Sequence, residues 1–196
     1  MDAVVGGRSV GTPGVPRLLA TVHAAHGKLP WARVLRPAIR LANQGFVVSQ
    51  RLSTLLAHDR ATLRRDPAAR QYFFPGGVPL KAGTRKRNLA YARTLKLLAR
   101  QGPAAFYGGR VAGDIVRAVR EAPGNPGVLA RRDLADYRTR ERPPVCAPYR
   151  VWQVCGMGPP SAGGLTIGEV LGMLEPYDLA ALGPRNPAAW RLIANA

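Results

Sequence analysis

The sequence predicts an α+β protein that is mostly helical and has one β-hairpin in its C-terminal half. In the first two thirds of the chain, apolar residues recur at intervals of three and four, which is typical of amphipathic helices. After about residue 133 the chain becomes β-branched and aromatic around a short polar turn, as in a hairpin. The apolar helical faces outnumber the strands available to cover them, so we assign residues 1–196 to a single, partial layered domain.

The predicted helices are bounded by capping and breaking residues. Pro30 starts the second helix, Gly45 ends it, and Ser49 caps the third. Residues 66–84 and 101–109 are rich in proline and glycine and are predicted to be loops. Helices are predicted at residues 13–26, 30–45, a stretch beginning after Ser49, 88–100, 110–120, a stretch beginning after Gly164, and 187–196.

The composition is strongly basic, with 29 Lys and Arg against 11 Asp and Glu and a formal net charge of +18. Our alternative hypothesis is therefore a stand-alone basic helical module that binds nucleic acid or an anionic surface. Against it, the basic residues are spread along the chain, and only Tyr91 could stack near the densest cluster, residues 85–87. We expect no nucleic-acid partner. No apolar run is long enough to span a membrane, and the first residues do not resemble a signal peptide.

The two cysteines, Cys146 and Cys155, lie in the predicted hairpin. If residues 147–150 form the turn, Cys146 lies opposite Val151, and Cys155 is several residues further along, too far for a disulfide. We therefore predict two unpaired cysteines that pack as small hydrophobic residues. No histidine is near them in the sequence, so we predict no zinc site, and we expect neither a metal nor a cofactor elsewhere.

The segment that most suggests chemistry is GMGPPSAGG, residues 156–164, between the hairpin and the following helix. Ser161 is a candidate nucleophile, a candidate member of a phosphate-binding loop, or a turn residue. A nucleophile elbow needs small residues two before and two after the serine, and Pro159 occupies the first position. The segment also lacks the Lys-Ser/Thr pair of a Walker loop. The remaining interpretation is a turn in which the Ser161 hydroxyl caps the helix, with an open backbone at Gly163 and Gly164 that attracts anions.

The residues alone complete no catalytic set. His23 and His26 are spaced to share a metal, but no third ligand is near in the sequence, and we predict a surface or partly packed pair. His58 and Asp59 are expected on another helix. Nothing in the sequence links any histidine to Ser161.

Several motifs occur in order along the chain. They are Val-Gly-Thr-Pro-Gly at residues 10–14, the stretch 23–31, Pro-Ala-Ile-Arg-Leu-Ala at 37–42, Gly-Phe-Val-Val-Ser at 45–49, Gly-Pro-Ala-Ala-Phe-Tyr-Gly-Gly at 102–109, Asp-Leu-Ala-Asp-Tyr at 133–137, and Pro-Pro-Ser-Ala-Gly-Gly at 159–164. Together they resemble the γ-glutamyltranspeptidase (glutathione hydrolase) family, over residues 5–196 and in the later part of the large subunit.

The resemblance implies a partial N-terminal-nucleophile hydrolase αββα sandwich, from a precursor that cleaves itself into two subunits. It also implies that the N-terminal Thr of the small subunit attacks a γ-glutamyl amide, with its own amine as base. The acyl group then passes to water, an amino acid or a peptide. A cephalosporin-acylase-like specificity is the alternative within the same family.

The nucleophile and the small subunit of that family have no counterpart in these 196 residues. We therefore expect no catalytic and no substrate-binding residue here, and no activity from the chain alone. The expected partners are the N-terminal segment and small subunit of the same enzyme, with glutathione-like molecules bound only by the complete enzyme. The expected location of the complete enzyme is periplasmic or secreted. Ser161, Gly163 and Gly164 are assigned to a family turn near the core, in which Gly158 and Ala162 replace the family's Pro and Ser.

Overall fold

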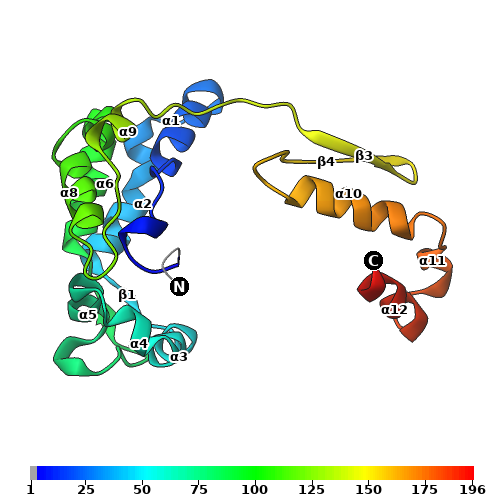
Figure 1. Cartoon of the computed structure of the whole chain (residues 1–196), viewed down its shortest axis with the longest axis horizontal. Helices are drawn as coiled ribbons and strands as arrows, with labels where there is room; N and C mark the ends of the chain where they lie inside the picture. Colours follow the sequence, from blue (N-terminus) through cyan, green and yellow to red (C-terminus); the bar gives the residue numbers. More distant parts are fainter. Residues whose placement is uncertain (1–3) are drawn as a thin grey trace. The chain divides into compact units, whose positions relative to one another are not determined.

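The computed structural model describes residues 4–196, and the chain divides into two compact units, Met1–Thr139 and Arg140–Ala196 (Figure 1). Each unit is described by itself. The assignment of all 196 residues to one partial domain therefore stays a prediction. The α+β fold class is confirmed, because the described residues are mostly helical and contain two small antiparallel sheets.

The first unit is a set of helices with one small two-stranded sheet, in which each strand has two residues. Its elements are η1 (Gly7–Ser9), α1 (Val15–His26), α2 (Trp31–Gln44), β1 (Phe46–Val47), α3 (Gln50–His58), α4 (Arg60–Leu63), α5 (Pro67–Phe73), η2 (Pro75–Gly77), β2 (Arg85–Lys86), α6 (Leu89–Gln101), α7 (Ala104–Tyr107), α8 (Arg110–Arg120) and α9 (Arg131–Ala135). The predicted cap of α3 is confirmed, since Ser49 Oγ accepts a hydrogen bond from Leu52 N at 3.1 Å. Asn88 caps α6 in the same way, through Tyr91 N at 2.9 Å.

Several features of this unit differ from the prediction. Residues 101–109, predicted to be a loop, contain the short helix α7. Residues 66–84, predicted to be a loop, contain the helix α5. Its start combines two favourable signals: the Asp66 carboxylate accepts the N–H of Ala69 at 2.6 Å, and Pro67 occupies the first helical position. The residues after α2 also pair as a short strand, with Phe46 opposite Lys86 and Val47 opposite Arg85.

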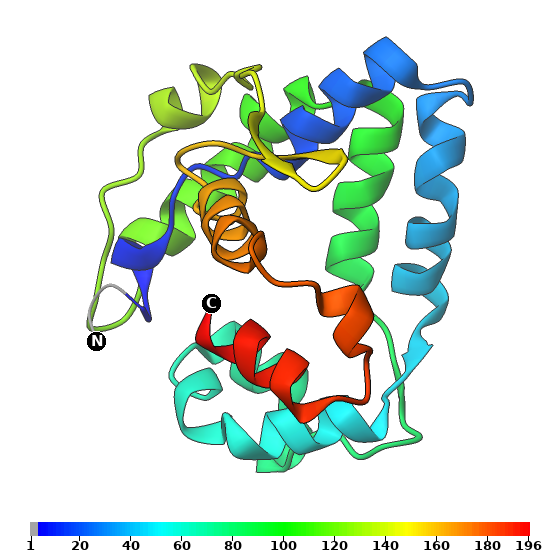
Figure 2. The same ribbon diagram turned by 90° about the vertical axis from the view of Figure 1, so that its right-hand side faces the viewer.

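Helices α2 and α6 lie side by side and antiparallel (Figure 2). Two hydrogen bonds fix this direction. Trp31 at the start of α2 donates its indole N–H to Leu98 O near the end of α6, at 2.8 Å. At the other end, Asn88 N donates to Ala42 O at 2.9 Å. Ala42, Ala92 and Leu95 form the buried contact between the helices, and Leu35 and Ile39 pack against it.

The second unit is a hairpin that carries one long helix on a single face. Its elements are β3 (Val145–Tyr149), β4 (Trp152–Gly156), α10 (Gly163–Leu174), α11 (Leu179–Leu182) and α12 (Pro187–Asn195). Burial alternates along β3, with Val145, Ala147 and Tyr149 half-buried and Cys146 and Pro148 exposed. Since α10 packs on both strands, the half-buried side chains are those on the face that α10 covers.

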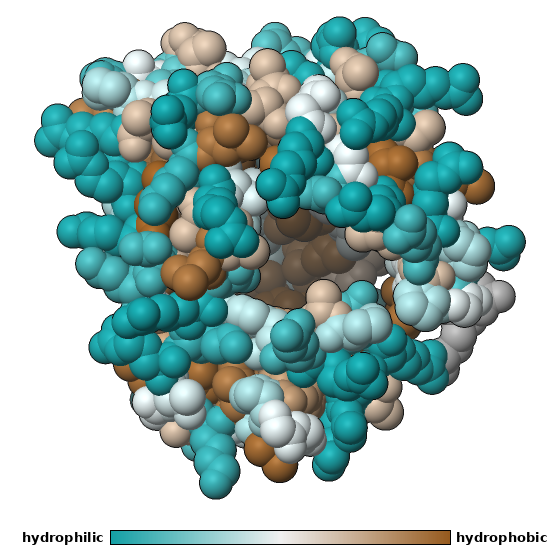
Figure 3. Space-filling model, turned by 90° about the vertical axis from the view of Figure 1, so that its left-hand side faces the viewer, coloured by the Kyte–Doolittle hydropathy of each residue, from teal (hydrophilic) through white to brown (hydrophobic). Residues whose placement is uncertain are grey.

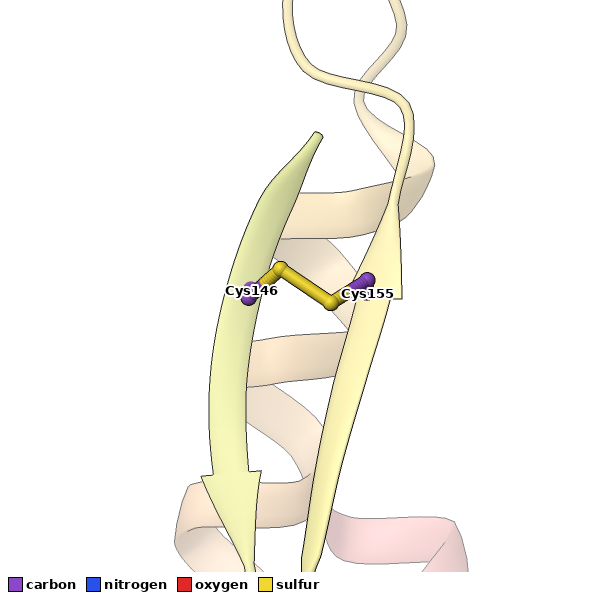
Figure 4. The surroundings of a disulfide bond; sticks show 2 residues. All are labelled: Cys146 and Cys155. Atoms are coloured by element: carbon purple, nitrogen blue, oxygen red, sulfur yellow. A yellow bond between two sulfur atoms is a disulfide. The ribbon is translucent and has the colours of Figure 1, made fainter. Parts of the chain in front are cut away.

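The prediction of two unpaired cysteines is wrong, because Cys146 and Cys155 form a disulfide across the hairpin (Figure 4). The turn is centred two residues later than predicted, at Arg150 and Val151, so that Cys146 lies directly opposite Cys155. Their Cα atoms are 4.1 Å apart. A shift in the position of the turn changes every cross-strand pair, which is why the predicted register excluded the bond.

Many large apolar side chains remain exposed, and Figure 3 shows some of them between hydrophilic side chains on one face of the molecule. The apolar face of α1 is the clearest case. Its residues Val15, Leu18, Leu19 and Val22 are between 48% and 62% exposed, and α1 contains no buried residue. Amphipathic helices normally bury such a stripe, so in this unit the face of α1 has no cover.

Candidate functional site

The candidate site is the turn at residues 156–164, which connects β4 to α10 inside the second unit. Ser161 N donates to Gly158 O at 3.1 Å, which closes the turn. The exposed Ser161 hydroxyl accepts the N–H of Gly163 at 3.3 Å, at the first residue of α10. The predicted capping role of Ser161 is therefore close to what the structure shows, although the N-cap position itself is occupied by Ala162.

Glycines let the strand and the helix approach each other closely at this turn. A Cβ atom added to Gly164 would lie 2.8 Å from Met157 O and 3.3 Å from Gly156 Cα. Conversely, a Cβ atom on Gly156 would lie 2.8 Å from Gly164 Cα. Real Cβ atoms do not sit this close to backbone, so the pair Gly156 and Gly164 allows a contact that no side chain would permit. The signal in the sequence is the spacing of the glycines around Pro159 and Pro160.

The turn contains no assembled nucleophile. The second unit has no histidine, and the hydrogen bond of the Ser161 hydroxyl within it is the one from Gly163 N. The N–H groups of Gly164 and Leu165, in the first turn of α10, have no acceptor among the described residues. Unpaired donors are normal at the start of a helix. This geometry supports a structural turn with an open backbone.

A second feature of this unit was missed from the sequence. Arg150, the first residue of the hairpin turn, has φ of 58° and is the only described residue other than glycine with a positive φ. Two-residue turns with a positive φ at this position favour glycine. The Arg150 N–H lies 3.2 Å from both carboxylate oxygens of Glu175, just after the end of α10, and its guanidinium donates to Tyr177 O. These contacts hold the turn against the end of the helix.

The motifs of the first unit meet at Tyr107, which is 2% exposed. Its hydroxyl donates to Pro13 O at 2.6 Å and accepts from Arg17 N at 3.2 Å, which ties α7 to the start of α1. The Tyr137 ring stacks on the Tyr107 ring with centroids 5.8 Å apart. A side chain at Gly14 would collide with the Tyr137 hydroxyl. Three sequence motifs are therefore used here for packing.

Burial raises the pKa of the Tyr107 phenol above its ordinary value, and the effect of burial exceeds the opposing effect of Arg17. The guanidinium of Arg17 lies over the Tyr107 ring, 4.4 Å from the centroid. The phenol is therefore neutral at physiological pH and able to donate its hydrogen bond. This agrees with a structural role for the residue.

The histidines form no metal site. His23 Nε2 lies 2.8 Å from Leu29 O, and the His23 ring packs edge-on against Trp31. His58 pairs with Asp59 at 2.9 Å on the surface. Across residues 4–196, no group of three or more His, Cys, Asp or Glu is placed to hold a metal ion. In the same part of the chain, no helix has the combination of length and apolar character that a membrane crossing requires.

Comparison with solved structures identifies the class of the fold. The chain is similar to the gamma-glutamyltranspeptidase of Helicobacter pylori, with a TM-score of 0.90 and 28% identity, over 98% of this chain and 54% of that chain. This likeness puts the chain among the N-terminal-nucleophile hydrolases with an α+β fold. The family model described as Gamma-glutamyltranspeptidase matches residues 1–196, and the chain belongs to this family.

Two curated relatives show how much of a family member is present. The Acylase ACY 1 proenzyme of Pseudomonas sp. (strain V22) is 40% identical over 196 residues, which are 100% of this chain and 34% of the relative. The Glutathione hydrolase proenzyme of Escherichia coli (strain K12) is 33% identical over 187 residues, which are 95% of this chain and 32% of the relative. The chain therefore spans about a third of the length of the relatives it matches.

Proposed function

We propose that the chain supplies part of the large-subunit frame of an enzyme that transfers γ-glutamyl groups to water, amino acids or peptides. The observation that carries the proposal is the family match over the whole chain, residues 1–196. The two curated relatives above are proenzymes about three times as long, so the activity belongs to a longer polypeptide or to a complex. Glutathione-like amides are the proposed substrates.

The chain alone is proposed to be inactive, because a threonine must be N-terminal for its own amine to act as the base. The eight threonines of the chain are all internal: Thr12, Thr21, Thr54, Thr62, Thr84, Thr94, Thr139 and Thr166. Three of them, on α1, α3 and α6, donate their hydroxyls to the backbone carbonyl four residues earlier: Thr21, Thr54 and Thr94. These three hydroxyl groups are therefore already engaged in hydrogen bonds within their own helices.

The turn with Ser161, Gly163 and Gly164 is proposed to be scaffold. Its glycine contact between β4 and α10 supports this assignment, as does the local hydrogen bond of the Ser161 hydroxyl. In the complete enzyme the turn would hold a core strand and a helix in place beside the nucleophile supplied by the small subunit.

The uncovered apolar faces support the proposed partners, namely the remaining large-subunit segment and the small subunit. Helix α10 has a single charged residue, Glu169, and its Leu165, Ile167 and Met173 are between 46% and 53% exposed. A helix that is apolar on all sides is normally buried on all sides. With strands from the rest of the enzyme, the hairpin and α10 would become two layers of one αββα domain, which would unite residues 1–196.

An acylase specificity is the second candidate. The observation that favours it is the identity to the Acylase ACY 1 proenzyme, 40% against 33% for the glutathione hydrolase of Escherichia coli. Both candidates share the N-terminal-nucleophile mechanism, so they differ in the substrate pocket and not in the chemistry. For the location of the complete enzyme we propose the periplasm or secretion, and the disulfide Cys146–Cys155 supports an oxidising compartment.

The test uses γ-glutamyl-p-nitroanilide as the transpeptidase substrate and a cephalosporin-type amide as the acylase substrate. The purified chain is expected to release no p-nitroaniline above background, and release by the chain alone would refute the proposed need for a partner. The chain is then expressed joined to the coding sequence that surrounds it in its genome. This longer product is expected to cleave itself before a Thr and then to hydrolyse one of the two amides. The amide that it hydrolyses faster distinguishes a γ-glutamyl-transferring enzyme from an acylase. A longer product that matures without hydrolysing either amide would contradict the proposed reaction.

A further inference from the structure

The antiparallel helices α2 and α6 carry matching rows of cations. On α2 the row is Arg33, Arg36 and Arg40, and on α6 it is Arg93, Lys96 and Arg100. Both rows have the spacing i, i+3, i+7, which places their members on one side of a helix. All six side chains belong to exposed residues, and neither helix contains an Asp or a Glu.

Both rows lie on the same side of the helix pair. On α2 the row is centred about a third of a turn beyond the contact residues Leu35, Ile39 and Ala42, at about 100° per residue. On α6 the row is centred about a third of a turn beyond the buried Ala92, Leu95 and Leu98, in the same sense. Because the helices are antiparallel, equal rotations in the same sense bring both rows to one face.

The rows also match along the helix axes. The hydrogen bonds Trp31 to Leu98 and Asn88 to Ala42 fix which residues are level. Between them, Arg33 falls level with Lys96, and Arg36 falls level with Arg93. Arg40 and Arg100 have no partner at the same level and lie at opposite ends of the array. With packed helices about 8–10 Å apart and a rise of about 1.5 Å per residue, the cations form two staggered rows that together span about 16 Å along the helix axes. We call these six residues the basic face.

No carboxylate neutralises the basic face. Among residues 4–196, none of its six members is in an ion pair. Asp114 on α8 lines a shallow pocket that Arg93 also lines, but its carboxylate pairs with Arg110 at 3.5 Å and with Arg117 at 2.6 Å. The positive potential of this face is therefore open to an external anion.

The shape and surroundings of the basic face indicate which anion it fits. Single-stranded nucleic acid needs aromatic platforms, and Tyr91 lies on the side of α6 opposite the cations, while Trp31 is bound to Leu98 O in the helix contact. The disulfide indicates an oxidising compartment, where lipid surfaces are available and nucleic acid is not a usual neighbour. We infer that α2 and α6 form a docking face for the anionic headgroups of an acidic phospholipid layer, held at the surface without insertion.

The test measures co-sedimentation of the 196-residue chain with vesicles of phosphatidylcholine alone, or containing about one third phosphatidylglycerol. In the first variant, Arg33, Arg36, Arg93 and Lys96 are replaced by Gln. In the matched control, four exposed arginines elsewhere lose the same charge: Arg51, Arg120, Arg185 and Arg191, each replaced by Gln. Gln is a good helix former, and circular dichroism checks that both variants keep the helicity of the unchanged chain.

The unchanged chain is expected to bind only the acidic vesicles, and to lose binding as salt is added. The basic-face variant is expected to bind these vesicles about a hundredfold more weakly, and the control variant within about threefold of the unchanged chain. Equal losses in both variants would show that net charge alone acts, and would overturn the inference. Absence of binding to acidic vesicles would also overturn it. Tighter binding of duplex DNA or inorganic polyphosphate than of vesicles, per charge, would overturn the assignment to lipid.

Discussion

Two regions of the molecule bury their family-motif residues to different extents. One is the Tyr107 cluster of the first unit, made of Tyr107, Leu134 and Tyr137. The other is the hairpin–α10 layer of the second unit, made of β3, β4 and α10. Around Tyr107 the motif residues are closed off, with Leu134 fully buried and the phenol paired to two backbone groups. In the second unit, the hairpin covers one side of α10, while Leu165, Ile167 and Met173 stay about half exposed. The first region is closed within its own unit, whereas the second unit leaves one side of α10 uncovered by its own residues.

Substitutions of similar motif residues are therefore expected to lower the free energy of unfolding by different amounts in the two regions. In a closed region, removing a side chain leaves a cavity or an unpaired polar group. In an open layer, the same change on an uncovered face removes little, because water already occupies that side. In the hairpin–α10 layer, only substitutions at the disulfide and at the contact between Gly156 and Gly164 are expected to lower stability strongly.

The largest contrast is expected from one substitution made in both regions. Leu134→Ala should lower the free energy of unfolding of the first unit by about 3 kcal/mol, because it empties a fully buried site. Leu165→Ala, at a residue that is 46% exposed, should change stability by less than about 0.5 kcal/mol. Urea unfolding followed by circular dichroism measures both. Equal losses would erase the distinction between the closed and the open region.

The disulfide should be the main internal tie of the open layer. Replacing Cys146 and Cys155 by Ser should destabilise the second unit by about 2–3 kcal/mol, because the unfolded chain gains conformational entropy when the loop is no longer closed. A reducing agent should bring the unchanged chain to the same level and leave the double variant unaffected. Amide hydrogen exchange resolves the two units. A loss that appears in the first unit instead would contradict this account.

The glycine contact should be the next most sensitive point. Gly164→Ala should cost about 2 kcal/mol, because its Cβ would lie 2.8 Å from Met157 O and the strand and helix must move apart. Gly172→Ala is the matched control on the same helix, with no heavy atom within 4 Å of the added Cβ. The control should stabilise α10 by about 0.5–1 kcal/mol. Thermal unfolding that shows the same sign for both would remove the evidence for close packing at the turn.

The smallest expected effect concerns the Tyr107 hydroxyl. Tyr107→Phe should cost about 1–2 kcal/mol near neutral pH, because Pro13 O and Arg17 N lose their partner. Tyr91→Phe, at a residue that is 55% exposed, serves as the control and should be nearly neutral. Chemical unfolding of the two variants measures the difference. If both lose the same free energy, the hydroxyl does not tie α7 to α1.

The same phenol predicts a pH dependence. Burial raises the pKa of Tyr107 in the folded chain above the unfolded value of about 10. Its contribution to stability is therefore complete below about pH 10 and is lost as the pH rises through the higher folded value. The unchanged chain should lose more stability than Tyr107→Phe over this alkaline range. Parallel curves for the two proteins would contradict the raised pKa.

Much of the fold could be predicted from the sequence, because caps and apolar spacing act locally. Ser49 was recognised as the cap of α3, and the turn at 156–164 was placed between the hairpin and α10. The disulfide was missed because the register depends on Arg150, an arginine at a positive φ that local propensity disfavours. Arg150 contacts Glu175 and Tyr177, which lie 25 and 27 residues further along the chain, so the pattern of neighbouring residues does not predict these contacts.

Hydrogen exchange of the chain by itself, compared with the chain inside the longer polypeptide encoded around it, tests the central claim most directly. We predict that the amides of α10 and the hairpin exchange much faster than those of α6 and α8 in the isolated chain. In the longer polypeptide, α10 and the hairpin should become as protected as α6, while the Tyr107 cluster should not change. If the amides of α10 were as protected from exchange as those of α6 in an isolated monomer, the result would contradict the claim that the rest of a γ-glutamyltranspeptidase-family enzyme covers the apolar faces of α10.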